Sequence, residues 1–69
     1  MSSKTNLSEA RFIRLPDVKT ITGLSRSTIY KKIAADEFPK QIPVGSNSVV
    51  WVKHQIDEWC DRLIASSDL

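Results

Sequence analysis

Residues 26–32 concentrate side chains that can donate hydrogen bonds or carry positive charge. They are Arg26, Ser27, Thr28, Tyr30, Lys31 and Lys32. Ile29 and Ile33 stand four residues apart, which predicts a helix whose apolar inner face leaves the cationic side chains outside. Cations and polar groups on an outward helix face are typical of a helix that binds DNA. A plain corner between two helices of a helical protein is the competing interpretation.

The residues before this helix predict another helix and a tight turn. Pro16 suits the first position of a helix, because its missing N–H is not needed there. Apolar residues then recur every three positions, which predicts a helix over residues 16–22. Gly23 permits the left-handed conformation that ends a helix, and the hydroxyl of Ser25 can accept a backbone hydrogen bond that starts the next one. The result is a helix-turn-helix, whose second helix can enter the major groove of DNA.

The middle of the chain predicts a β-hairpin. The second helix should end near Asp36, because Pro39 excludes the residue before it from helical conformation. Two β-prone runs, residues 40–44 and 49–52, then flank the turn-forming residues 45–48. Two such runs separated by four turn residues are typical of a hairpin.

Apolar residues at helical spacing predict a third, amphipathic helix over residues 53–65. Near the other end of the chain, residues 12–15 predict a short strand or an extended lead-in. The expected core comprises Val18, Ile21, Leu24, Ile29, Ile33, Phe38, Ile56, Trp59 and Leu63, with Val44, Val49 and Trp51 closing the hairpin. Trp59 should contribute most to this core because of its size.

Length and composition limit the chain to one small folded domain. Its 69 residues are 41% hydrophobic and 26% charged, a mixture that favours a packed core over disorder. We expect a flexible tail over residues 1–10 and the domain over residues 11–66. Up to Ile56, nine basic residues stand against four acidic ones, whereas the remainder has one basic and four acidic residues. A basic part and an acidic end suit a protein that binds a polyanion with one face.

The sequence contains no catalytic or metal-binding constellation. Cys60 and His54 are the only residues of their types, which excludes an internal disulfide and a zinc finger. Asp57, Glu58 and Asp61 have no base beside them, so we expect a solvated helix face there. No run of about 18 apolar residues occurs that could span a membrane. We therefore expect a cytoplasmic protein that is not an enzyme and needs no metal or cofactor, and DNA binding would place it at the nucleoid.

Several short runs, spread over about residues 11–64, together form a specific pattern. They are Arg14-Leu15-Pro16-Asp17-Val18, Thr22-Gly23-Leu24-Ser25-Arg26-Ser27-Thr28-Ile29-Tyr30, Glu37-Phe38-Pro39-Lys40, Val44-Gly45 with Val49 and Trp51, and Ile56-Asp57-Glu58-Trp59. This pattern resembles the AlpA family of phage and prophage regulators. That family is related to MerR-type winged helix-turn-helix domains and to phage excisionases.

The resemblance implies a mainly α domain of three helices with a small β-hairpin, the winged helix-turn-helix. Its second helix would lie in the major groove, with the hairpin as the wing. Arg26 is then the candidate for a bidentate contact to guanine, and Lys31 and Lys32 are candidates for phosphate contacts. The Tyr30 hydroxyl could reach a phosphate, or the ring could cover the apolar edge of the domain. The remaining candidate DNA-binding residues are Ser27, Thr28, Ser46 and Asn47.

Two positions depart from the family pattern. Asp36 stands where members tend to have glycine, so the second helix must end on a residue that tolerates the left-handed conformation less well. The wing tip, residues 45–48, carries no basic side chain. A wing contact with DNA would therefore use hydroxyl, amide or backbone donors.

The resemblance implies sequence-specific binding to double-stranded DNA and regulation of prophage or mobile-element genes. An excisionase-type factor, which bends DNA and steers an integrase, would have the same fold, and the sequence does not separate the two. A basic adaptor that binds an acidic protein is the alternative from another class. A domain of this size reads few base pairs, so dimers or tandem copies on DNA are expected.

Overall fold

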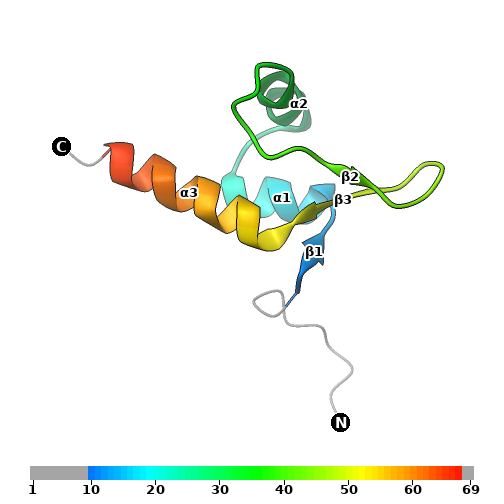
Figure 1. Cartoon of the computed structure of the whole chain (residues 1–69). Coiled ribbons are helices and arrows are strands. Elements are labelled where there is room, and N and C mark those ends of the chain that lie inside the picture. Colours follow the sequence, from blue (N-terminus) through cyan, green and yellow to red (C-terminus); the bar gives the residue numbers. More distant parts are fainter. Residues whose placement is uncertain (1–9, 68–69) are drawn as a thin grey trace, which may run out of the picture.

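The computed structural model describes residues 10–67; residues 1–9, most of the expected tail, and residues 68–69 lie outside the described part. The elements in chain order are β1 (Phe12–Ile13), α1 (Leu15–Thr22), α2 (Arg26–Ala34), β2 (Ile42–Pro43), β3 (Val49–Val52) and α3 (Lys53–Ser67). Figure 1 shows α1 and α3 across the middle of the molecule, with α2 above them. The order and types of these elements agree with the predicted winged helix-turn-helix.

α1, α2 and the three residues between them form the predicted helix-turn-helix. Gly23 has a φ of 75°, and its N–H donates to the carbonyl of Lys19. The hydroxyl of Ser25 accepts the N–H of Thr28 at 3.2 Å, which caps α2. The predicted left-handed glycine and the predicted serine cap are both confirmed. Local interactions therefore hold the turn at both of its ends.

The C-terminal end of α2 has the geometry of a Schellman motif. Asp36 adopts the left-handed conformation with a φ of 64°. Its N–H donates to the carbonyl of Ile33, and the N–H of Glu37 donates to the carbonyl of Lys32 at 2.8 Å. Glycine usually occupies the left-handed position of this motif, because it has no Cβ to clash with the backbone. The helix thus ends where predicted, on a residue that is strained relative to glycine.

β3 is the central strand of a three-stranded antiparallel sheet with the order β1-β3-β2. Ile13 pairs with Trp51, and Ile42 pairs with Val50. The lead-in before α1 is therefore a strand, and the predicted hairpin is present. Its first strand is short and lies at the edge of the sheet, a position that tolerates Pro43.

The core lies where the three helices meet the sheet. The buried residues are Ile13, Val18, Ile29, Phe38, Val50, Trp51 and Ile56. Trp51 is the largest fully buried side chain, and its indole N–H donates to the carbonyl of Pro39 at 3.1 Å. The prediction that Trp59 contributes most to the core is wrong. Trp51 has that role, because the central strand is packed by both α1 and α3.

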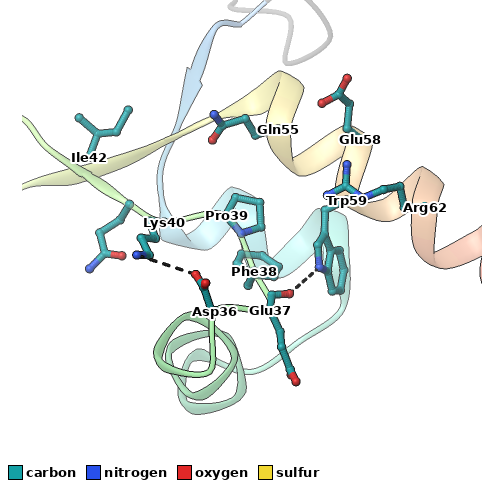
Figure 2. Close-up of a pocket in the computed structure, with 11 residues that line it drawn as sticks. Asp36, Glu37, Phe38, Pro39, Lys40, Ile42, Gln55, Glu58, Trp59 and Arg62 are labelled. Carbon is teal, nitrogen blue, oxygen red and sulfur yellow. Dashed lines mark hydrogen bonds and ion pairs between the residues drawn. The ribbon is translucent and has the colours of Figure 1, made fainter.

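Trp59 instead closes the domain at its edge, where it is half-buried. Its ring packs edge-to-face on Phe38, with ring centroids 4.8 Å apart. Its indole N–H donates to the backbone carbonyl of Glu37 at 2.9 Å (Figure 2). Trp59 therefore fixes the segment that follows α2 against α3.

α3 extends past the rest of the domain at its C-terminal end (Figure 1). Its 15 residues correspond to about 22 Å, against about 12 Å for the 8 residues of α1. Leu63 and Ile64 are 53% and 65% exposed. The prediction that Leu63 belongs to the core is therefore wrong, because the apolar spacing continues beyond the elements that could cover it.

Candidate nucleic-acid interface

α2 carries three cations, none of which is buried. Arg26 and Lys31 are exposed and Lys32 is half-buried, whereas Ile29 on the inner face is fully buried. Within residues 10–67, no ion pair involves any of the three cations. The helix therefore presents positive charge that no carboxylate of the described residues neutralises. An anionic ligand such as a phosphate backbone would meet this charge directly.

Three hydroxyl groups gather at the N-terminal end of α2. Ser25 Oγ donates to Thr28 Oγ1 at 2.9 Å and lies 3.3 Å from Ser27 Oγ. Thr28 is half-buried, whereas Ser27 is exposed. The Thr28 hydroxyl thus accepts a hydrogen bond from the residue that caps its helix. Ser27 is the more accessible of the two predicted site residues.

Tyr30 joins the outer face of α2 to the core. Its ring packs edge-to-face on Trp51, with centroids 6.2 Å apart and an angle of 65° between the ring planes. The guanidinium of Arg26 lies over the Tyr30 ring, with Cζ 5.1 Å from the centroid, which is within cation–π range. The ring therefore covers an apolar edge of the domain and contacts the first cation of the helix.

The hairpin loop is a second exposed element near the sheet. Ser46 and Asn47 are exposed at its tip, and Figure 1 shows the loop projecting beyond the body of the molecule. The N–H of Val44 donates to the carbonyl of Ser48 at 2.9 Å, which closes the loop. Val44 itself is 55% exposed. The prediction that it closes the hairpin core is wrong, because Val44 follows β2 in the hairpin loop, where its side chain stays exposed.

An ion pair on α3 reduces the positive charge away from α2. Lys53 Nζ lies 2.6 Å from a carboxylate oxygen of Asp57, and the lysine side chain is only 15% exposed. His54 Nε2 lies 3.1 Å from a carboxylate oxygen of Glu58. Glu58 and Asp61 are exposed, as expected of a solvated helix face, whereas Asp57 is half-buried and paired. Lys53 belongs to the structure of α3 and adds no free cation.

The one cysteine is poorly placed for chemistry. Cys60 is a free, half-buried thiol. Burial raises the pKa of this thiol, and the negative charges of Asp57 and Asp61 raise it further. The sulfur is thus held in its protonated, weakly nucleophilic form near neutral pH.

The described residues offer no second site of obvious chemistry. In residues 10–67 there is no group of three or more His, Cys, Asp or Glu side chains that could hold a metal ion. None of the helices there has the length and apolar composition that crossing a membrane requires. An open groove of about 770 Å³ runs between residues 36–42 and α3 (Figure 2). Its lining mixes Trp59 with charges of both signs, such as Glu58 and Arg62, whereas the charged side chains of α2 are all cationic.

The fold and its exposed cationic helix define a three-helix winged helix-turn-helix domain. The family model of the prophage CP4-57 regulatory protein (AlpA) matches residues 11–64, and the chain belongs to this family. It is 40% identical over 60 residues to the protein ORF88 of Enterobacteria phage P4, covering 87% of this chain and 68% of that protein. It is also 40% identical over 63 residues to a protein of Escherichia coli K12 named DNA-binding transcriptional activator AlpA, and the match covers 83% of this chain and 90% of that protein. The resemblance predicted from the sequence is confirmed.

The structure brings together part of the predicted site and adds one residue to it. All of the predicted α2 residues lie on one helix, and the wing residues Ser46 and Asn47 lie on the separate hairpin loop. Trp51, which the sequence assigned to the closure of the hairpin, supports α2 through Tyr30. The sequence signal for this role is weak, because all four residues of β3 are apolar and show no alternation.

Proposed function

We propose that the protein binds double-stranded DNA in a sequence-specific manner and thereby regulates transcription of prophage or mobile-element genes. The observation that carries this proposal is α2 itself, whose three cations follow a tight turn and have no ion-pair partner within residues 10–67. Membership of the AlpA family and the name of the Escherichia coli relative support it. Such a protein would act in the cytoplasm, at the nucleoid.

In this proposal α2 enters the major groove and each element has a separate task. Arg26, in the first turn of α2, donates two hydrogen bonds to one guanine. Lys31 and Lys32 bind phosphates and set the register of the helix on the duplex. Ser27 and Thr28 belong to the same N-terminal end, where Ser27 has the more accessible hydroxyl.

The hairpin loop acts as the wing in the same proposal. Ser46 and Asn47 are exposed at its tip and provide a hydroxyl and an amide. These uncharged donors can bind phosphate oxygens or the minor groove, but they add no Coulombic attraction. We therefore assign most of the binding free energy to α2 and a smaller part to the wing.

The experiment that tests this proposal is in vitro selection from a random-sequence duplex library, followed by a mobility-shift assay with the selected duplex. Arg26→Ala should weaken binding to that duplex by about 1–3 kcal/mol and relax the preference at one base position. Arg62→Ala, which removes a cation from α3, is the matched control and should leave the preference unchanged. If no duplex is enriched, sequence-specific binding is wrong. If Arg26→Ala weakens selected and random duplexes equally, Arg26 binds a phosphate instead of a base.

Regulation of transcription and excisionase-type bending of DNA are distinguished by a different measurement. A circular-permutation mobility shift with the selected duplex reports the bend angle of the complex. An unbent complex supports regulation of transcription, in which the bound protein acts on polymerase or competes with a repressor for DNA. A strong bend favours an architectural factor that steers an integrase.

A further inference from the structure

A series of contacts links the exposed guanidinium of Arg26 to the core. Arg26 Cζ lies 5.1 Å from the centroid of the Tyr30 ring, and that ring packs edge-to-face on Trp51 at 6.2 Å. Trp51 is fully buried and donates its indole N–H to the carbonyl of Pro39. The ring beneath the guanidinium is therefore held by a side chain that the core fixes in place.

We propose that Tyr30 is a positioning residue that holds the Arg26 side chain ready for contact with a base edge. This inference rests on the proposed function and deepens it, because it assigns the preference at one base position to a pair of residues. An exposed arginine has many rotamers and loses this freedom when it binds. A ring one helical turn away restricts the same freedom before DNA is bound. No ion pair within residues 10–67 competes for this guanidinium.

The backbone under Arg26 is ordered as well. The hydroxyl of Ser25 accepts the N–H of Thr28 at 3.2 Å and donates to the Thr28 hydroxyl at 2.9 Å. Arg26 is the first residue of the helix that this cap starts. The Ser25 cap thus orders the backbone that carries Arg26, and the Tyr30 ring contacts the guanidinium at the other end of that side chain. The geometry matches the preorganisation that reduces the entropy loss of binding.

Two substitutions of Tyr30 separate positioning from a direct contact of its hydroxyl with phosphate. Tyr30→Phe keeps the ring and removes the hydroxyl, whereas Tyr30→Leu keeps apolar bulk and removes the π face. If the ring positions Arg26, Tyr30→Phe should keep the affinity for the selected duplex within about twofold. Tyr30→Leu should lower it about two- to fivefold, the size of an exposed cation–π interaction. Equal losses in both variants would overturn the proposal, because the hydroxyl would then bind the DNA itself.

A double-mutant cycle tests whether the effect passes through Arg26. The same Tyr30→Leu substitution is made in an Arg26→Gln background, and binding to the selected duplex is measured for all four proteins. The two- to fivefold loss should disappear in the Arg26→Gln background, because no guanidinium remains to be positioned. An unchanged loss would mean that Tyr30 acts independently of Arg26 and would overturn the proposal. Tyr30→Met replaces Tyr30→Leu if circular dichroism shows that the leucine variant does not fold.

A measurement without DNA tests the positioning by itself. The aromatic ring should shift the NMR resonances of the Arg26 side-chain methylene groups in the free protein. Tyr30→Leu should return these resonances to positions typical of an exposed arginine, and Tyr30→Phe should keep them shifted. Unshifted resonances in the wild type would overturn the proposal. Because this measurement needs no duplex, a failure to select DNA would refute the proposed function without deciding whether Tyr30 holds Arg26.

Discussion

Replacing Asp36 with glycine should stabilise the domain, although it removes a charged side chain and an ion pair. Asp36 has a φ of 64°, and the left-handed conformation costs about 1–2 kcal/mol for an L-residue, somewhat less for aspartate. Glycine avoids this cost but loses about 0.4–1 kcal/mol through the greater freedom of the unfolded chain. The ion pair with Lys40 is long, at 3.8 Å, and both side chains are mostly exposed, so its contribution is small. We expect a net gain of about 0.5–1 kcal/mol, or about 2–8 °C in Tm.

Thermal unfolding followed by circular dichroism measures this effect. Ala35→Gly is the matched control, because Ala35 has a φ of −88° and gains nothing from glycine. It should lower Tm, and Lys40→Ala should leave Tm nearly unchanged. If Asp36→Gly lowers Tm as Ala35→Gly does, the left-handed conformation of Asp36 stores no strain and the explanation is wrong.

Three further predictions concern the edges of the domain. Trp59→Ala should destabilise the domain by about 3 kcal/mol in urea unfolding, because it removes the packing on Phe38 and the hydrogen bond to Glu37. In the same assay Leu63→Ala, at an exposed position, should change stability by less than about 0.5 kcal/mol. Similar effects of the two substitutions would contradict the assigned burial. Ser25→Ala should cost about 1 kcal/mol through loss of the α2 cap, and Ser25→Asp should restore most of it; no loss in the alanine variant would show that the cap is not needed. The thiol of Cys60 should react with iodoacetamide more slowly than a cysteine in an unstructured peptide, because its raised pKa leaves less of it as the reactive thiolate at a given pH. An equal or faster rate would be incompatible with that direction of the pKa.

The helix-turn-helix is the part of the fold that the sequence predicts most reliably, because its signals are local. Gly23 and Ser25 act on backbone groups within four residues of themselves. The extent of the core is not a local property. Leu63 continues the apolar spacing of α3, but whether a neighbour covers it depends on the length of the elements beside it. A periodic pattern alone therefore overestimates the core at the end of a long helix.

The candidate site likewise has local features that the sequence predicts and non-local contacts that it does not. The residue types on α2 are apparent from the sequence, but the contact between Tyr30 and Trp51 joins distant parts of the chain. The uniform apolarity of β3 hides which of its side chains face α2. The pairing of Lys53 with Asp57 could have been inferred from their spacing of four residues. A count of charges along the chain misses it and overstates the free positive charge outside α2.

The salt dependence of DNA binding tests the central claim most directly. Phosphate contacts of Lys31 and Lys32, together with those of one or two other cations, correspond to about three to four phosphates, so log K should fall against log salt with a slope near −3. The double variant Lys31→Ala/Lys32→Ala should flatten this slope by about two units, whereas Arg62→Ala on α3 should leave it unchanged. If the double variant keeps the wild-type slope, α2 is not the helix that binds DNA, and a basic adaptor for an acidic protein becomes the better account.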